Sequence, residues 1–410
     1  MSSKFLYITY DGLTDPLGRS QIIPYLTSLA GSGYSISVIS AEKKYAYTNS
    51  KVKILKILKD HNIKWHPVFY TKKPYIFSTL WDIIKIRRKA KLLHKKHKFE
   101  VTHCRSYIPA LTGLYLKKKY AVKFIFDMRG FYPDERIEGN TWKISNPVHK
   151  CIYRYFKRKE NDFLKSADTI VCLTEKAKEI IYGNPLFINN KPQVEVIPCC
   201  ADFHLFCPVT ENSDRLNEFR TMLGMIDTDF ILSYSGSTGT WYMLDEMLRF
   251  FKCLSEKREN ARFLIITQDN KTGILKQAYE QGIPKEKMII ASAEREEMPF
   301  LLGLSDLSVF FIKPVFSKKA SSPTKMAELM AMGIPFISNR DVGDINEIIE
   351  ATGAGMLVRD FSDDEYYKVI DKIDDLLAVN REKIINSARK LFSLQKGGVL
   401  YGNIYRQLSV

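Results

Sequence analysis

The 410-residue sequence lacks the features of several protein classes. No apolar run approaches the roughly 18–20 residues that a membrane-spanning helix needs. The seven cysteines are an odd number and include no Cys-x-x-Cys pair, which argues against a disulfide framework and against a zinc site. The N-terminal residues 1–4 lead directly into an apolar segment and do not have the layout of a signal peptide. We therefore expect a cytoplasmic protein whose thiols are reduced and mostly buried.

Acidic residues are too few to balance the basic ones. There are 62 Lys and Arg residues against 46 Asp and Glu residues, and the net charge is +16. This charge attracts polyanions such as nucleic acid, anionic lipid or phosphorylated substrates. No recognised nucleic-acid-binding motif is present, so a nucleic-acid-binding protein remains an alternative that salt-dependent DNA binding would reveal. The 45% hydrophobic and 26% charged fractions are typical of a folded soluble protein, and the length favours two domains.

Apolar segments alternate with helical patterns in two similar halves of the chain. The strands expected in the first half are 4–9, 36–40, 101–103, 124–127, 168–173 and 194–197. Those expected in the second half are 231–235, 263–267, 288–291 and 307–311. Strands that alternate with helices predict doubly wound parallel sheets. The Gly-x-Gly-x-x-Gly fingerprint of dinucleotide-binding folds is absent, which weakens a dinucleotide interpretation.

Residues 320–338 have the pattern of a polar loop, a short helix, a Gly-Ile-Pro stop and a buried strand. Pro323 suits the first turn of a helix, and Ser321 and Ser322 stand where an N-cap is favoured. The N-terminus of a helix exposes backbone N–H groups with positive dipole character. This segment is therefore well suited to hold an anion such as phosphate.

Three further side chains extend this interpretation. Thr324 and Lys325 stand beside the helix start, and Glu328 lies one turn further in. The Glu328 carboxylate could accept hydrogen bonds from hydroxyl groups next to a bound phosphate. The pattern fits a nucleoside diphosphate and its ribose. The alternative is an ordinary capped helix with a solvated Glu328.

The segment resembles the nucleotide-sugar signature of glycosyltransferase family 4, whose members have the GT-B fold. In that family two glutamates eight positions apart flank the helix start; the second binds the ribose and the first contacts the donor sugar. Glu328 matches the second, whereas Ala320 occupies the place of the first. The Ser-Ser-Pro-Thr-Lys form is similar to a branch of the family in which the loop itself takes that role. The resemblance covers almost the whole chain and is strongest in 229–358.

The resemblance implies an α/β protein of GT-B fold, with two doubly wound Rossmann-like domains facing a cleft. Residues 1–205 would form the acceptor-side domain, 206–392 the nucleotide-sugar-binding domain, and 393–410 a terminal helix that returns to the first domain. The family transfers sugar with retention of configuration and without a bound metal. The only Asp-x-Asp sequence, at 227–229, precedes a strand rather than following one, which agrees with metal independence.

The function implied is a retaining glycosyltransferase that moves a sugar from a nucleoside diphosphate sugar to a glycan or lipid-linked acceptor, in surface polysaccharide or glycolipid synthesis. Two alternatives share the fold. A sugar-nucleotide epimerase would need acid/base carboxylates around the sugar and would act without an acceptor. A catalytically inactive nucleotide-sugar-binding partner would explain Ala320, and donor hydrolysis by pure protein would count against it.

The donor-binding candidates come mainly from two loops. Loop 236–240 offers backbone N–H groups and hydroxyls but lacks the Arg and Lys that many family members carry there. Lys325, Arg295 or the lysines at 313, 318 and 319 could supply that charge. Gly18, at the entry of the first helix, could let a diphosphate approach the backbone or serve as a plain turn glycine. The donor-binding candidates are Gly18, Gly236, Ser237, Thr238, Arg295, Ser321, Ser322, Pro323, Thr324, Lys325 and Glu328.

The remaining candidates lie at strand ends. His103 ends a strand of the first half, where doubly wound folds place their ligands. The resemblance implies that a histidine at this position lies near the reaction centre. Arg105 stands where many members of the family have a second histidine. The alternative for His103 is an ordinary core or surface histidine. The catalytic candidates are His103, Arg105, Lys325 and Glu328. The charged loop after the next strand supplies the acceptor-side candidates Arg129, Asp134, Glu135 and Arg136, with a self-paired salt-bridge loop as the alternative.

The segment 51–98 is strongly basic. Trp81, Ile84, Leu92 and Leu93 alternate in it with Lys85, Arg87, Arg88, Lys89, Lys91, Lys95, Lys96 and Lys98. This pattern predicts a basic amphipathic helix of the kind that lies on anionic membranes. A solvated charged face is the alternative. We therefore hypothesise peripheral contact with the inner face of the cell membrane.

Overall fold

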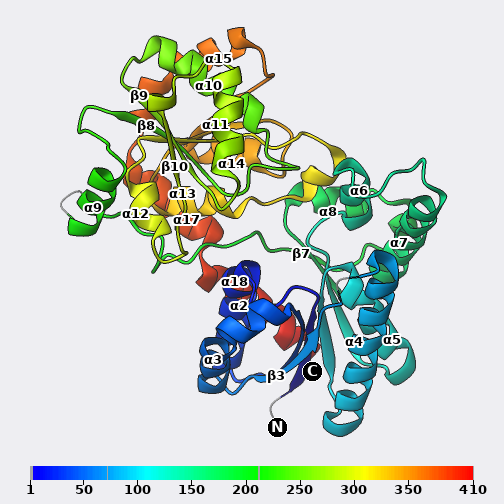
Figure 1. The fold of residues 1–410 in the computed structure, drawn as a ribbon. Helices are drawn as coiled ribbons and strands as arrows, with labels where there is room; N and C mark the ends of the chain where they lie inside the picture. The colour runs from blue at the N-terminus through cyan, green and yellow to red at the C-terminus, as the bar shows by residue number, and fades with distance from the viewer. Residues whose placement is uncertain (1–2, 72, 211–212, 410) are drawn as a thin grey trace. The chain divides into compact units, whose positions relative to one another are not determined.

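The computed structural model describes residues 3–71, 73–210 and 213–409, and the chain folds into two compact units (Figure 1). The first unit is Met1–Pro198 together with Leu394–Val410, and the second is Cys199–Ser393. The first unit thus ends a few residues before 205. Ala201 belongs to the second unit because its N–H donates to the Phe392 carbonyl and it forms a β-bridge with Ser393. Residues 1 and 2, which belong to the N-terminal segment predicted not to be a signal peptide, lie outside the described residues.

The first unit is built on a seven-stranded parallel sheet with the order β3-β2-β1-β4-β5-β6-β7. Its strands are β1 Lys4–Thr9, β2 Ser35–Glu42, β3 Lys64–Phe69, β4 Val101–Arg105, β5 Lys123–Asp127, β6 Thr169–Cys172 and β7 Val194–Val196. Its helices are α1 Pro16–Gln21, α2 Ile23–Gly31, α3 Lys44–Asp60, α4 Tyr75–His97, α5 Tyr107–Tyr120, α6 Tyr132–Glu138, α7 Pro147–Ser166, α8 Glu175–Tyr182 and α18 Leu394–Leu408. The order of the strands is that of a doubly wound sheet, as the sequence predicted.

The second unit is built on a six-stranded parallel sheet with the order β10-β9-β8-β11-β12-β13. Its strands are β8 Phe230–Ser235, β9 Ala261–Ile266, β10 Met288–Ala291, β11 Leu307–Phe310, β12 Phe336–Asn339 and β13 Gly355–Val358. Its helices are α9 Asp214–Met222, α10 Leu244–Lys257, α11 Lys271–Glu280, α12 Met298–Gly303, α13 Thr324–Ala331, α14 Ile345–Thr352, α15 Asp363–Ile370, α16 Ile373–Leu377 and α17 Arg381–Phe392.

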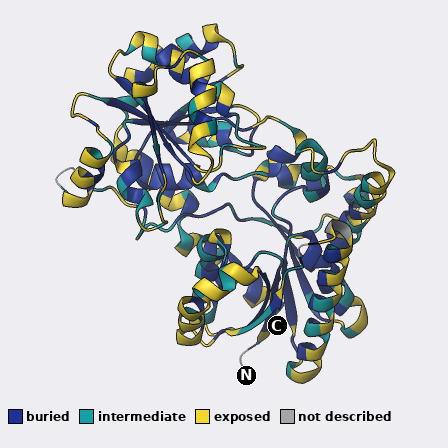
Figure 2. Cartoon of the chain, viewed as in Figure 1, coloured by how far each residue is buried: buried dark blue, intermediate teal, exposed yellow. Residues whose placement is uncertain are grey.

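The core of each unit is its sheet with the inner faces of the surrounding helices. Figure 2 shows the strands almost wholly in the buried colour, and the helices with exposed outer faces. In β8 every residue is buried, and in β1 all residues after Lys4 are buried. A parallel sheet covered on both faces explains why these strands are continuous apolar runs instead of alternating patterns. Among the described residues, no helix combines the length and the apolar character needed to cross a membrane.

Two local predictions were wrong. The sequence pattern predicts a single helix at 20–30, but the structure has two helices, α1 and α2, which are separated at Ile22, whose backbone is not helical. Pro24 has no N–H to donate to the carbonyl four residues earlier, so a continuous helix would lose a hydrogen bond there. The charged loop expected after β5 becomes helix α6 from Tyr132, because Pro133 and the acidic residues that follow it suit a first helical turn.

The terminal helix α18 packs in the first unit, against β1 and α2. The rings of Phe5 and Tyr405 stack at 3.9 Å between centroids, and Tyr34 Oη donates to the Gly402 carbonyl at 3.3 Å. Gly398 permits this approach, since a Cβ there would lie 2.3 Å from Ser28 Oγ. The helix thus brings the end of the chain onto the first sheet.

Candidate active site

Helix α13 begins in the polar segment that the sequence singled out, but its start differs in detail. Pro323 is the N-cap residue and makes no side-chain cap, so the predicted serine cap was wrong. Ser322 Oγ instead accepts a hydrogen bond from the Cys199 N–H at 3.2 Å. The helix start is therefore left without a side-chain acceptor of its own, which suits an external anion.

Glu328 is buried in α13 and not solvated, so the alternative of a solvated carboxylate was wrong. Its side chain lies 3.4 Å (Oε1) from Arg295 Nη1. Burial raises the pKa of Glu328 to about 7, although Arg295 and Lys325 oppose this shift. The Arg295 guanidinium also lies over the ring of Phe206, 5.3 Å from its centroid. The predicted donor residues Arg295 and Glu328 are thus in contact.

Lys325 is a buried lysine whose side-chain nitrogen has no hydrogen-bond acceptor in the described part of the chain. Its ammonium lies 4.1 Å from the ring centroid of Tyr234 and 3.6 Å from that of Tyr242. Aromatic faces compensate only part of the lost hydration, and burial lowers the pKa of Lys325 well below its usual value. The charged form of Lys325 is therefore disfavoured by its surroundings, and an incoming anion would stabilise it.

The Lys325 ammonium points at the loop that follows β8. A Cβ on Gly236, whose φ is +123°, would lie 3.0 Å from Lys325 Nζ. The lysine thus stands at the loop from which the family's usual basic residues are missing. Other polar groups of this loop are already used: Asp269 Oδ2 accepts from the Thr238 N–H at 2.6 Å and from its hydroxyl at 2.9 Å, and Tyr234 donates to the Ser237 carbonyl.

The remaining donor candidate, Gly18, lies in the first unit. A Cβ at this position would lie 2.1 Å from the Gly12 carbonyl oxygen. Close contact between α1 and the loop after β1 is therefore sufficient to explain this glycine. That loop is fixed by the buried Glu42 carboxylate, which accepts hydrogen bonds from the N–H groups of Leu13 at 2.7 Å and Thr14 at 3.2 Å.

The second set of candidates lies in the first unit, around β4 and β5. His103 is not at a strand end, because β4 continues to pair with β1 and β5 as far as Arg105. The His103 side chain is 2% exposed, and burial lowers its pKa. Its Nδ1 lies 3.0 Å from Tyr405 Oη and its Nε2 lies 3.5 Å from Asp127 Oδ2. The histidine is thus enclosed within the unit.

Two guanidinium groups flank the buried Asp127. Arg105 Nη1 lies 3.9 Å from Oδ2, and Arg129 Nη1 lies 3.7 Å from Oδ1. Arg105 Nε also lies 3.4 Å from Oδ2 of the partly exposed Asp11. Burial by itself would raise the pKa of Asp127, but the cations, Arg129 first, hold it at about 2. The carboxylate is therefore ionised at neutral pH.

The other acceptor-side candidates are partly used within the first unit. Asp134 accepts from Tyr153 Oη at 2.9 Å and from Lys157 Nζ at 3.0 Å, which joins α6 to α7. The Arg136 guanidinium lies over the ring of Tyr132. Glu135 stands in the first turn of α6. Arg129 is the member of this group that lies beside His103 and Arg105.

Sequence reasoning missed three participants: Asp127, Tyr401 and Tyr405. Asp127 ends a strand, and a carboxylate in that place is a usable signal. Tyr401 and Tyr405 are four residues apart on the terminal helix and so share a face, but nothing in the sequence indicates what that face contacts. Tyr401 Oη donates to Asp127 Oδ2 at 3.0 Å.

The Asp-x-Asp sequence lies at the start of β8, at the opposite end of this strand from Gly236. Asp227 pairs with Arg220 at 2.5 Å and Asp229 with Arg262 at 2.9 Å. Within the described residues, no group of three or more His, Cys, Asp or Glu side chains is placed to hold a metal ion.

Comparisons with known proteins agree with this architecture. The family described as glycosyl transferases group 1 matches residues 217–391, and the family described as Glycosyltransferase Family 4 matches residues 26–204. A search of curated proteins found no match. Among solved structures, sucrose-phosphate synthase from Thermosynechococcus elongatus is similar with a TM-score of 0.72 and 14% identity, covering 99% of each chain.

Two further structures show the same fold. A glycosyltransferase from Rickettsia africae has a TM-score of 0.70 and 16% identity, covering 99% of this chain and 98% of its own. HepE from Anabaena, solved in complex with UDP-glucose, has a TM-score of 0.69 and 14% identity, covering 99% of each chain. With both halves matched by glycosyltransferase families and both sheets arranged as in these structures, the chain is a glycosyltransferase of GT-B fold that belongs to glycosyltransferase family 4 (group 1).

Proposed function

We propose that this chain is a retaining glycosyltransferase that takes its sugar from a nucleoside diphosphate sugar bound at α13 of the second unit. One observation carries the proposal: among the described residues, the buried Lys325 amine has no hydrogen-bond acceptor, and it lies next to Gly236 and one turn before the buried Glu328. Negative charge grows on the diphosphate as it leaves. A fixed cation in a site of low polarity stabilises that charge more in the transition state than in the ground state.

The donor candidates on and beside α13 have distinct roles in this proposal. Lys325 and the start of α13, with Ser321, Ser322 and Thr324 beside it, bind the diphosphate, and no bound metal is needed for that role. Glu328, held by Arg295, accepts hydrogen bonds from the ribose hydroxyls. Arg105 and Arg129 of the first unit serve the acceptor, a glycan or a lipid-linked sugar. The UDP-glucose bound by HepE supports the donor class.

The donor class can be tested with purified protein. We expect uridine, guanosine or adenosine diphosphate, or one of their sugars, to raise the melting temperature, since a ligand that binds only the folded state stabilises it. Titration calorimetry then gives its dissociation constant, and NMR of the products gives the anomeric configuration. Epimerisation of the sugar without acceptor would replace the proposal by an epimerase. A protein that binds none of these ligands would contradict it.

We also propose that the first unit docks on anionic membrane through the outer face of α4. Apolar side chains are exposed along this face at Phe77, Leu80, Trp81, Ile84 and Leu92. Leu93, which the sequence placed in the same stripe, is buried and belongs to the core. The Arg88 guanidinium lies 6.0 Å from the centroid of the Trp81 ring, so the cations stand beside the apolar stripe. Helices that lie in a membrane interface have a surface of this kind, which supports the proposal.

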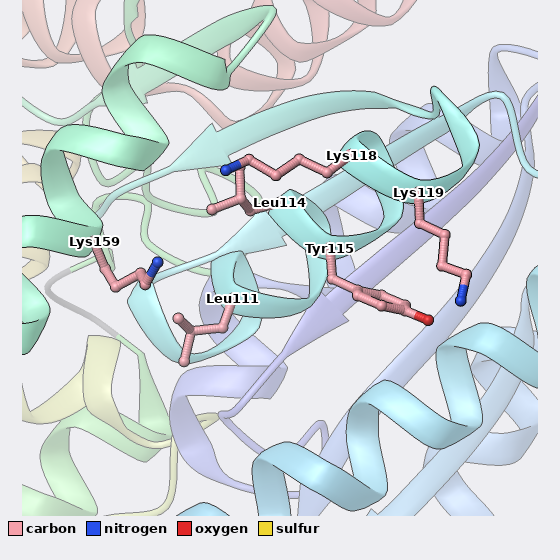
Figure 3. A pocket seen from close by; sticks show the side chains of 6 residues that line it. All are labelled: Leu111, Leu114, Tyr115, Lys118, Lys119 and Lys159. Carbon is pink, nitrogen blue, oxygen red and sulfur yellow. The ribbon is translucent and has the colours of Figure 1, made fainter.

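A basic groove lies next to α4. In Figure 1, α4 and α5 run side by side, and the Arg87 guanidinium lies over the Tyr115 ring. Tyr115 lines a groove of about 430 Å³ whose other lining residues are Leu111, Leu114, Lys118, Lys119 and Lys159. Figure 3 shows Lys118 and Lys159 extending over one end, and Lys119 beside Tyr115 at the other. The groove extends the basic, partly apolar surface that an anionic lipid would contact.

Vesicle co-sedimentation tests the docking surface. We expect binding to vesicles with anionic lipid, weaker binding at high salt, and loss of binding when Arg88, Lys91, Lys95 and Lys96 are replaced by Glu. Each cation near such a surface contributes about 1 kcal/mol. The matched control is the same charge change on α3, at Lys51, Lys53, Lys56 and Lys59, which we expect to retain most of the binding. Wild-type protein that stays in the supernatant at low salt would contradict docking and favour a soluble acceptor.

A further inference from the structure

The terminal helix α18 contributes two hydroxyl groups to the buried cluster around His103. Tyr401 and Tyr405 are one turn apart, and their rings lie 5.4 Å and 5.8 Å from the His103 ring between centroids. Tyr401 Oη contacts Asp127 Oδ2, and Tyr405 Oη contacts His103 Nδ1, each at 3.0 Å. Helix α18 is therefore hydrogen-bonded directly to His103 of β4 and to Asp127 of β5.

The directions of these hydrogen bonds follow from Asp127. Its carboxylate lies between the guanidinium groups of Arg105 and Arg129, which stabilise the ionised form. An ionised carboxylate can only accept, so Tyr401 donates to it. Nε2 of His103 faces the same carboxylate at 3.5 Å. This distance is long for a hydrogen bond, so the contact is mainly electrostatic. Within the described residues, Nε2 has no hydrogen-bond acceptor at normal geometry. The negative charge favours the tautomer with its proton on Nε2.

The remaining nitrogen of His103 is then an acceptor. Nδ1 carries no proton in this tautomer, so the Tyr405 hydroxyl donates to it. Both ring nitrogens are directed at groups of the first unit, and the side chain is almost fully buried. A general base needs a nitrogen within hydrogen-bonding reach of the proton that it removes. His103 offers no such nitrogen in this arrangement.

We propose that Tyr401, Tyr405 and His103 are positioning residues, which hold Asp127 so that it orients Arg105 and Arg129 for the acceptor. His103 then acts through Asp127 and not as a base on the substrate. Helix α18 becomes part of the acceptor-side machinery by the same contacts. The expected effect of these residues on kcat rests on the proposed glycosyltransferase function. The hydrogen-bond arrangement around His103 does not depend on that function.

The arrangement is tested by NMR of protein labelled with ¹⁵N-histidine, with His103→Gln used to assign the His103 signals. We expect the neutral ring of His103 to carry its proton on Nε2. Tyr405→Phe should shift the Nδ1 signal, because this nitrogen loses its donor. A ring protonated on Nδ1 would overturn the proposal, whatever the activity of the protein.

Kinetics tests the positioning role. We expect Tyr401→Phe to lower kcat roughly 10- to 100-fold, since small displacements of positioned groups have effects of this size. The matched control is Tyr34→Phe, which also removes a hydrogen bond between α18 and the rest of the first unit but lies outside the Asp127 contacts. This variant should change kcat less than twofold. Equal kcat values for the two variants would overturn the proposal.

A second pair of variants separates positioning from base catalysis. His103→Gln can still donate to Asp127, so it should be at least about tenfold more active than His103→Ala. Equal loss in both variants, with unchanged melting temperatures, would assign His103 to direct catalysis. Donor affinity is measured in parallel. Failure of the proposed glycosyltransfer would appear as wild-type protein without donor binding or transfer, and the NMR result then decides the inference alone.

Discussion

Replacing Lys325 by methionine is expected to lower kcat for sugar transfer roughly 10²- to 10³-fold, while the melting temperature stays unchanged or rises. The loss follows from the removal of one preorganised group that stabilises charge developing on the leaving diphosphate, for which factors of this size are typical. Methionine has a similar length and keeps the apolar contacts with Tyr234 and Tyr242, so the site keeps its shape.

The melting temperature of Lys325→Met is expected not to fall because the wild-type lysine is unfavourably placed in the folded protein. Lys325 is buried without a hydrogen-bond acceptor among the described residues, and burial lowers its pKa. The folded chain therefore binds fewer protons at this position than the unfolded chain, which disfavours folding below the usual lysine pKa. Methionine removes this cost. A variant that loses activity but not stability is typical of a residue retained for function.

The control for this experiment is Lys276→Met on α11 of the same unit. Lys276 forms an exposed pair with Glu280, and such a pair contributes little to stability. We expect wild-type kcat and melting temperature for this variant. Wild-type turnover of Lys325→Met, or a loss confined to acceptor affinity, would show that Lys325 does not serve the leaving group.

Replacing Glu328 by glutamine is expected to weaken binding of the nucleoside diphosphate by roughly 1–3 kcal/mol, about 5- to 150-fold, because a hydrogen bond from a hydroxyl to a carboxylate is lost or weakened. The ligand provides the matched control. A nucleoside diphosphate without the ribose 2′- and 3′-hydroxyls should bind wild type and variant with equal affinity. Titration calorimetry of both proteins with both ligands forms a double-mutant cycle that isolates the contact with the ribose. A coupling energy of zero would remove Glu328 from the ribose site.

The same substitution changes how stability depends on pH. Burial raises the pKa of Glu328 from 4.5 to about 7, so the folded chain binds more protons than the unfolded chain between these pH values. The contribution of Glu328 to the free energy of unfolding therefore falls as pH rises from 4.5 to 7, by up to about 3 kcal/mol. Glu328→Gln should equal wild type in stability near pH 4 and exceed it near pH 8. Denaturant unfolding of both proteins across this range checks the sign, and parallel curves would contradict it.

Much of the fold could be predicted from local patterns. Strands such as β1 and β10 have the predicted bounds, because a short apolar run buried on both faces of a parallel sheet is recognisable by itself. Two of the failures lie where a proline changes a local rule: Pro24 divides the first helix, and Pro133 starts α6 inside the expected loop. The exposed stripe of α4 was found in part, but periodicity could not place Leu93 in the core, since burial depends on which neighbour a helix packs against.

The sequence by itself determined the two α/β halves, a helix that begins close to Pro323, and Lys325 and Glu328 as its chemically significant side chains, because helix signals and spacing act over a few residues. Only the tertiary structure decided the states of those side chains. The position of Lys325 depends on Tyr234 of β8 and on Gly236 and Tyr242 in the segment that follows this strand. The state of His103 depends on Tyr405, 302 residues later in the chain. Protonation and hydrogen-bond direction follow from such distant neighbours, since burial and charge act through space and not along the chain.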